Sequence, residues 1–172
     1  MDSTDFYKEV VEIINKYNIK GSDINIEITE SLALVEDDVT LMNIKNLSSQ
    51  GIGLAMDDFG VGHSSLIYLT NMSFNKIKID GSLSRDIVNN EINSNIVSNI
   101  YDLCRLMDLE IVVEYVETQE QLEKILEIGK FLIQGYFVSP PINGIEVEEF
   151  ARRLNKPVSS DFDQFLYNDY GG

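Results

Sequence analysis

Four short apolar runs in the chain each end at a carboxylate. They end at Glu27, Asp57, Asp80 and Glu114. In a sheet of parallel strands that feed helices, the carboxyl ends of the strands converge on one edge, where such folds keep their chemistry. Several carboxylates gathered at that edge would make a cation site.

The densest of these motifs is Asp-Asp-Phe-Gly-Val-Gly-His-Ser-Ser-Leu at residues 57–66. Adjacent carboxylates at a strand end point in different directions, so Asp57 and Asp58 could serve two cations, as two-metal phosphoryl chemistry requires. The alternative is a helix N-cap followed by a tight glycine loop, where Asp and Gly are common for conformational reasons. The motif alone leaves both open, but it lacks the lysine of a Gly-x-x-x-x-Gly-Lys phosphate loop.

Lys78 lies between two isoleucines, with Lys76 and Asp80 on its own face of the strand. Nearby cations would lower the pKa of Lys78 and let it orient or deprotonate an attacking water. The alternative is that the three polar residues form the wet face of an edge strand. A central parallel strand is buried on both faces, which disfavours that alternative.

Glutamates at the ends of two other strands have competing interpretations. Glu27 would be a ligand that projects into the site and Glu30 a support for a neighbouring loop, or both are exposed acids that open the next helix. Glu114 follows Ile-Val-Val and is poorly solvated there unless a cation compensates it. Glu117 fits the first turn of a helix better, and Gln134 adds a neutral donor and acceptor after the last apolar run.

Hydrophobic periods of 3.6 and of two residues alternate along the chain. They predict helices near residues 6–17, 41–51, 64–69, 92–107, 118–129 and 146–154, and strands near residues 24–28, 53–57, 76–80, 110–114 and 131–135. Thr118 and Gln121 have the spacing of a capping box. Strand-then-helix units in succession predict an α/β fold with about five parallel strands and right-handed crossovers. A TIM-type barrel fits better than a doubly wound sheet because acids end nearly every strand, but 172 residues predict an incomplete barrel.

Composition excludes several classes of function. The formal net charge of −16 repels nucleic-acid backbones, so no DNA partner is expected. One histidine, His63, cannot build a multi-histidine zinc site. No apolar run approaches the ~18 residues of a membrane span, and the single cysteine, Cys104, has helical spacing with apolar residues and fits the core of a cytoplasmic protein.

The ordered motifs together resemble one protein family. Glu-Ile-Thr-Glu, Asp-Asp-Phe-Gly-x-Gly-x-Ser-Ser-Leu, Lys-Ile-Asp, Val-Glu-x-Val-Glu-Thr and Gln-Gly-Tyr-x-x-x-x-Pro are similar, in order and spacing, to those of the EAL domain of bacterial signalling. The resemblance runs from about residue 6 to residue 154, which makes residues 1–156 a partial EAL domain and residues 157–172 a polar tail. It implies an α/β barrel that uses two Mg²⁺ or Mn²⁺ ions to hydrolyse cyclic-di-GMP to linear pGpG.

The resemblance also assigns roles by motif position. It implies metal ligands at Glu27, Asp57, Asp58 and Glu114, catalytic roles for Lys78 and Glu114, a substrate contact at Gln134, supports at Glu30, Asp80 and Glu117, and a loop that couples the site to dimer contacts at Gly60, Gly62, His63, Ser64 and Ser65. The partners it implies are cyclic-di-GMP, a second copy of the chain, and sensor or cyclase domains upstream.

Two departures from the family pattern keep a second function open. The Glu-Ala-Leu signature is absent from the 172 residues, and Tyr115 stands beside Glu114 where the family usually has glycine. We therefore expect an open sheet edge near residues 24–28, which favours pairing between chains, and a tyrosine ring that crowds the ions or the substrate. The alternative function is a non-catalytic EAL-like module that binds cyclic-di-GMP or a partner protein. A barrel fragment that only self-associates through its edge is a third interpretation.

Overall fold

A computed structural model describes residues 6–29, 32, 38–60, 69 and 72–154. In chain order the elements are α1 (Phe6–Tyr17), the 3-10 helix η1 (Gly21–Asp23), β1 (Asn25–Thr29), α3 (Asp38–Ser49), β2 (Gly53–Phe59), β3 (Lys76–Ile79), α5 (Gly81–Ser84), α6 (Glu91–Leu106), β4 (Glu110–Val113), α7 (Gln119–Ile128), β5 (Leu132–Ile133) and α8 (Gly144–Leu154). Contacts divide the chain into two compact units, residues 1–138 and 139–172, and α8 belongs to the second.

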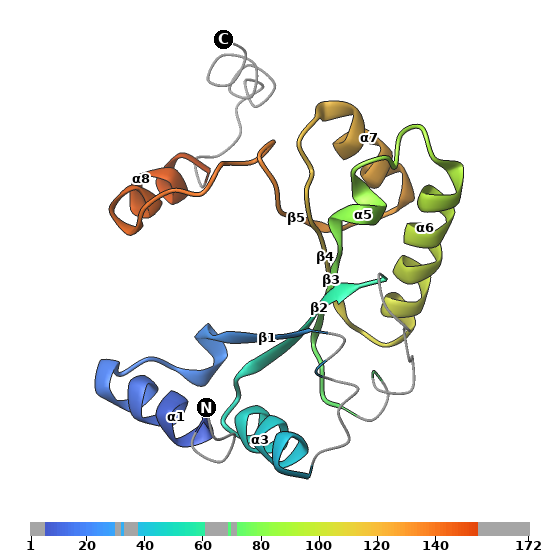
Figure 1. Ribbon diagram of the computed structural model, residues 1–172. Coiled ribbons are helices and arrows are strands. Elements are labelled where there is room, and N and C mark those ends of the chain that lie inside the picture. The colour runs from blue at the N-terminus through green and yellow to red at the C-terminus, as the bar shows by residue number, and fades with distance from the viewer. Residues whose placement is uncertain (1–5, 30–31, 33–37, 61–68, 70–71, 155–172) are drawn as a thin grey trace. The chain divides into compact units, whose positions relative to one another are not determined.

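The first unit is built on one parallel sheet of five strands, in the order β1-β2-β3-β4-β5. Parallel neighbours need crossover connections, and α3, α6 and α7 each lie in one of them. Figure 1 shows α6 and α7 side by side along one side of the sheet. The predicted α/β fold with about five parallel strands is confirmed.

The hydrophobic core lies between the helices and one face of the sheet. Every second residue along the central strands points into this core. The sheet residues in it include Leu54, Met56, Ile77, Ile79, Ile111 and Val113, all of them buried. Ile44, Val97 and Ile125 cover them from α3, α6 and α7. Each fully buried aliphatic side chain contributes about 1.5–3 kcal/mol, so this face fixes how the strands align.

Most predicted elements are present, and their ends have visible causes. Gly51 follows α3 with a φ of 76°, a left-handed conformation that glycine adopts without steric cost. The predicted capping box opens α7: Thr118 Oγ1 accepts from the Gln121 backbone, and Gln121 Oε1 accepts from the Thr118 backbone.

Other sequence predictions differ from the structure. β2 continues two residues beyond the predicted end at Asp57, and β5 has only two residues where five were expected. η1 and α5 were not predicted, because three or four residues carry no helical period. The helix expected near residues 64–69 lies outside the described residues, apart from Leu69, which is helical and buried.

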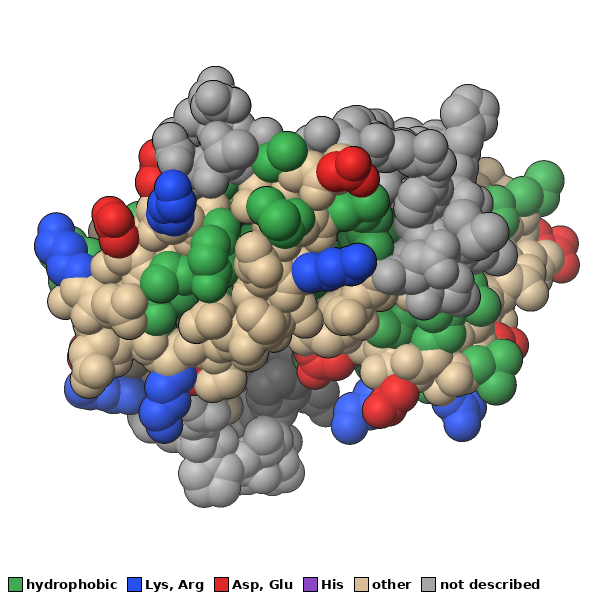
Figure 2. Space-filling model, turned by 90° about the horizontal axis from the view of Figure 1, so that it is seen from below, with side chains coloured by type: hydrophobic (Ala, Val, Ile, Leu, Met, Phe, Trp, Pro, Cys, Tyr) green, Lys and Arg blue, Asp and Glu red, His purple; other side chains and the backbone are tan. Residues whose placement is uncertain are grey.

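On the face drawn in Figure 2, hydrophobic side chains lie in several groups among other side chains and charges of both signs. Exposed large hydrophobic residues are common on protein surfaces and need no special explanation when they are scattered. No helix in the described part of the chain has the length and hydrophobicity that crossing a bilayer requires.

Candidate functional site

The strand register places five of the predicted site residues on the face of the sheet opposite the core. Residues paired across parallel strands share a face, and the pairs Glu27–Ala55, Ala55–Lys76 and Lys78–Val112 link all the strands from β1 to β4. Val112 pairs with Leu132, so Glu114 and Gln134, two residues further along, continue on the same face. The residues that share this face are Glu27, Asp57, Lys78, Glu114 and Gln134.

Lys78 is the centre of the site. Its Nζ lies 2.7 Å from Oε1 of Glu114, 2.8 Å from Oε2 of Glu27 and 2.9 Å from Oδ1 of Asp57. These carboxylates come from β1, from β2 and from just beyond the end of β4, and Glu27 is 51 residues from Lys78 along the chain. The convergence of carboxylates that the strand ends predict is therefore present, and an ammonium occupies its middle.

A β-bulge separates the two adjacent aspartates of β2. The register against β3 shifts between Met56 and Phe59, so two residues of β2 stand opposite Lys78. Asp58 adopts a φ of 57°, and left-handed backbone at a bulge turns a side chain out of the strand's alternation. Asp57 consequently contacts Lys78, whereas Asp58 is exposed and makes no ion pair with any described residue.

The cluster is buried at one end and open at the other. The exposed fraction of the side chains is 7% for Lys78 and 10% for Glu114, but 22% for Asp57 and 50% for Glu27. Three carboxylate groups surround one ammonium group. The site therefore carries excess negative charge beside an opening to solvent, which favours binding of a further cation.

The sequence predicts a pKa of Lys78 lowered by nearby cations, whereas the described partners of Lys78 are carboxylates, which raise its pKa. Burial by itself lowers the pKa of Lys78, but hydrogen bonds to Glu114, Glu27 and Asp57 raise it by more, and its pKa lies well above the usual range. Among the described residues the groups facing Lys78 are anions, not the cations that the prediction assumed. Lys78 is therefore a proton-bearing donor here and not a base.

Asp80 closes β3 as the N-cap of α5. Its Oδ1 accepts a hydrogen bond of 2.8 Å from the Ser82 backbone N–H. Burial raises the pKa of Asp80, but the hydrogen bonds from Ser82 and Gly81, together with the charge of Arg85, lower it, and the net shift is downward.

The remaining predicted residues lie apart from the lysine cluster or outside the description. Glu117 is exposed, and its backbone N–H donates to the Gln121 side chain. The side chain of Gln134 is exposed and reaches no partner among the described residues. Gly60 has a φ of 101° at the start of the predicted loop, whereas Glu30, Gly62, His63, Ser64 and Ser65 lie outside the described residues.

Sequence reasoning missed the polar framework that holds Glu114. The Ser84 hydroxyl donates to the backbone carbonyl of Glu114, and the buried Gln121 side chain donates to the carbonyls of Ser84 and Arg85, each at 3.2 Å. Gln121 also accepts from the Glu117 backbone at 2.7 Å. The capping-box spacing pointed to Gln121, but nothing local signalled that it also ties α7 to α5.

Tyr115 adopts an unusual backbone conformation directly after Glu114. Its φ is 56°, in the left-handed region that costs a non-glycine residue about 1–2 kcal/mol. This explains why a glycine suits the position. The ring lies against Gly81, and the Arg85 guanidinium lies 4.2 Å from its centroid.

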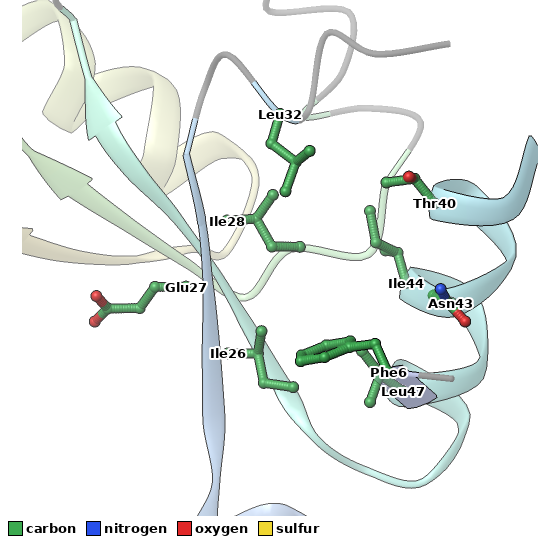
Figure 3. Close-up of a pocket in the computed structure, with 9 residues that line it drawn as sticks. All are labelled: Phe6, Ile26, Glu27, Ile28, Leu32, Thr40, Asn43, Ile44 and Leu47. Atoms are coloured by element: carbon green, nitrogen blue, oxygen red, sulfur yellow. The ribbon is translucent and has the colours of Figure 1, made fainter. Parts of the chain in front are cut away.

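An apolar cavity of about 280 Å³ lies behind β1, on the other side of the strand from the site. Its walls include Ile26 and Ile28 of β1 and Ile44 and Leu47 of α3. Figure 3 shows the Glu27 carboxylate pointing to the opposite side of β1 from Ile26 and Ile28. The period of two along β1 thus separates an acidic face from an apolar one.

The donors suit a divalent metal ion, although no group of three or more acidic, histidine or cysteine side chains in the described chain already surrounds a common metal position. Carboxylate oxygens are the ligands that Mg²⁺ and Ca²⁺ prefer. Asp57 Oδ1 is buried and, besides its ion-pair contact with Lys78, accepts no well-oriented hydrogen bond from the described residues. A carboxylate has about four lone-pair sites on its two oxygens, so Asp57 could serve a metal ion as well as Lys78.

Comparison with known proteins identifies the family. The EAL domain model matches residues 1–141. The chain belongs to the EAL domain family. Its relatives include the cyclic di-GMP phosphodiesterase PdeF of Escherichia coli, with 37% identity over 136 residues, which are 79% of this chain and 18% of PdeF.

Solved EAL structures resemble this one. The MucR phosphodiesterase of Pseudomonas aeruginosa in complex with c-di-GMP has a TM-score of 0.78 at 31% identity, covering 83% of this chain and 58% of that one. A manganese and cyclic-di-GMP complex of Klebsiella pneumoniae BlrP1 has a TM-score of 0.71 at 31% identity, covering 75% of this chain and 33% of that one. The chain spans about a fifth of the length of the curated relatives that it matches first.

Proposed function

We propose that this EAL domain takes part in the metal-dependent hydrolysis of cyclic-di-GMP to linear pGpG. The observation that carries the proposal is the set of three carboxylates from β1, β2 and the end of β4 around Lys78. Relatives named as cyclic di-GMP phosphodiesterases support the substrate and the reaction.

Glu27, Asp57, Asp58 and Glu114 would hold the metal. Glu27, Asp57 and Glu114 already converge, and Asp58, turned out by the bulge, is free to serve a second ion. Divalent ions bound there would neutralise the phosphate and make it easier to attack. We propose Mg²⁺ or Mn²⁺, and a manganese complex of BlrP1 supports a divalent ion of this kind.

The chain's own residues have roles that follow from their protonation and position. Lys78 would orient the attacking water by donating a hydrogen bond from Nζ in place of one of the three that its carboxylate partners now accept. Glu114 is a ligand or the base that takes a proton from that water. The water oxygen forms a bond to phosphorus, one bridging P–O bond breaks, and the leaving 3′ oxygen takes up a proton.

Supporting and coupling roles complete the proposal. Gln134, at the end of β5 on the same face, would contact the dinucleotide, and Asp80, Glu30 and Glu117 would support the loops around the site. The loop with Gly60, Gly62, His63, Ser64 and Ser65 would couple the site to a homodimer contact. We assign residues 1–156 to the partial EAL domain and residues 157–172 to a tail. We also propose a cytoplasmic protein with sensor or cyclase domains upstream. The relative MucR is named as a bifunctional diguanylate cyclase/cyclic di-GMP phosphodiesterase, which supports a cyclase domain.

The test is incubation of cyclic-di-GMP with Mn²⁺ and either this chain or a form extended upstream, followed by chromatography for pGpG. Product from either form that is lost in Glu114→Gln and kept in Glu110→Gln supports the proposal. Glu110 is a suitable control because it lies on the same strand but is 60% exposed in an ion pair with Lys76.

A non-catalytic receptor is the second candidate function. Tyr115, an aromatic residue with left-handed backbone directly beside Glu114, favours it because a bulky ring beside a proposed ligand would hinder the ions or the substrate. Binding of cyclic-di-GMP by both forms without any product would support the receptor and contradict the hydrolase.

A further inference from the structure

Arg85 is a cation at the carboxyl end of the acidic face that makes no ion pair among the described residues, although Asp80 is near enough to feel its charge. Its guanidinium carbon lies 4.2 Å from the centroid of the Tyr115 ring, a distance at which the ring's electrons attract a cation. No carboxylate lies within ion-pair distance of Arg85 among the described residues, and the residue is exposed. Its charge is therefore available to a ligand.

Three features of the chain place the Tyr115 ring under Arg85. Tyr115 has a φ of 56°, and its ring lies against Gly81 at the start of α5. Gly81 makes room, since a Cβ there would lie 2.2 Å from the ring's Cδ2. Arg85 is the C-cap of α5, and the buried Gln121 donates to its carbonyl at 3.2 Å. The aromatic surface and the arginine backbone are thus both fixed.

The position of this pair relates it to the site. Tyr115 directly follows Glu114, whose carboxylate contacts Lys78, and α5 begins directly after β3. Lys78 is fully engaged by three carboxylates. The divalent ions proposed above would serve the phosphate that is hydrolysed, and a cyclic dinucleotide carries a second phosphate. A guanidinium can bind two oxygens of such a group at once.

We propose that Arg85 binds a phosphate group of the cyclic dinucleotide and that Tyr115 is the positioning residue that holds it in place. This inference rests on the proposed function and deepens it. It also gives Tyr115 a role other than crowding the site: its ring holds a cation for the substrate.

The chain contains a matched control at the other end of the sheet. Arg105 lies over Tyr101, with 5.9 Å between the guanidinium carbon and the ring centroid, and it too is exposed and without an ion pair among the described residues. Arg105 lies in the last turn of α6, before the amino end of β4. Its removal changes the net charge as much as removal of Arg85.

The experiment is calorimetric titration of cyclic-di-GMP, in Ca²⁺ to avoid turnover, into the wild-type chain and its variants. Arg85→Gln is expected to weaken binding by about 10-fold, ~1.4 kcal/mol, and Arg105→Gln by less than about 2-fold. Arg85→Lys keeps the charge without the planar fork and is expected to lose roughly 3-fold. Tyr115→Phe keeps the ring and the affinity, whereas Tyr115→Leu weakens binding as Arg85→Lys does.

The outcomes separate this inference from the proposed function. Equal affinities of Arg85→Gln and Arg105→Gln, with binding by the wild-type chain intact, overturn the role of Arg85 and leave the function standing. No binding by the wild-type chain overturns the function and this inference with it. Thermal unfolding of each variant shows that it is folded, and both arginines are exposed enough for folding to survive their replacement.

Discussion

Two lysines of β3 lie on the same face of the sheet and have opposite surroundings. Lys76, near the amino end, pairs with one carboxylate, Glu110, at 3.4 Å, and that carboxylate is 60% exposed. Lys78, two residues further along, contacts three carboxylates at 2.7–2.9 Å and is 7% exposed. The same residue type on the same strand thus makes a surface ion pair at one end and the centre of a buried cluster at the other.

The difference shows what the carboxyl end of a parallel sheet adds. At that end the chain leaves each strand for a crossover, so acids from several strands can approach one point without interrupting the hydrogen-bonded ladder. At the amino end, Glu110 of β4 is the one carboxylate among the described residues that pairs with Lys76. Substitutions of matched residues at the two ends test this difference.

The largest expected effect is the loss of the Lys78 ammonium group, with Lys76 as the matched control. Lys78→Met leaves three carboxylates without their cation and is expected to lower the free energy of unfolding by about 3 kcal/mol. Lys76→Met breaks a solvent-exposed pair and is expected to cost about 0–1 kcal/mol. Urea unfolding measures both, and equal losses would contradict the contrast between the two ends.

Divalent cations should bind at the carboxyl end of the sheet and stabilise the folded chain from there. At a concentration of 100 times Kd, Mn²⁺ is expected to stabilise the wild-type chain by about 2.7 kcal/mol, roughly 5–10 °C in Tm. Glu110→Gln should keep this shift, and Glu114→Gln should lose most of it because it removes a proposed ligand. Thermal unfolding with and without Mn²⁺ measures the shift; the same response in both variants would place the ion elsewhere.

The hydrogen bonds of Gln121 behind Glu114 should contribute less to the free energy of unfolding than the Lys78 cluster, but more than an exposed hydrogen bond. Gln121→Leu leaves buried backbone groups of α5 and α7 without partners and is expected to cost about 2 kcal/mol. Gln119→Leu on the same helix removes only an exposed hydrogen bond to Glu123 and should cost less than about 0.5 kcal/mol. Urea unfolding tests the pair, and a loss in Gln119→Leu as large as that in Gln121→Leu would remove the special role of Gln121.

The smallest effect is the pH dependence that Asp80 adds at the end of β3. The folded chain lowers the pKa of Asp80, so its stabilisation is present above the unfolded pKa of about 3.9 and is lost as pH falls through the lower folded value. Asp80→Ala should therefore cost about 1 kcal/mol at pH 7 and nothing below the folded pKa. Unfolding measured from pH 7 to pH 2 checks this, with the exposed Asp86→Ala as control; a constant difference would show that the carboxylate charge is not involved.

Local sequence patterns predict much of the fold and part of the site. The period of two in Ile-Glu-Ile predicts β1 with Glu27 on one face and isoleucines on the other, as Figure 3 shows. Thr118 and Gln121 predict the start of α7 because capping is a contact between near neighbours. Where the pattern is too short, as in α5, the prediction fails.

Sequence pattern alone was enough for the order of strands and helices and for the acids that stand at or near the strand ends, because these depend on residues a few positions apart. Only the tertiary structure decided the bulge that separates Asp57 from Asp58, the bridge from Gln121 to α5, and the guanidinium of Arg85 over Tyr115. It also decided that Lys78 keeps its proton, since Glu27 and Glu114 reach it from distant parts of the chain. Long-range register sets which charges meet, and the charges that meet set the chemistry.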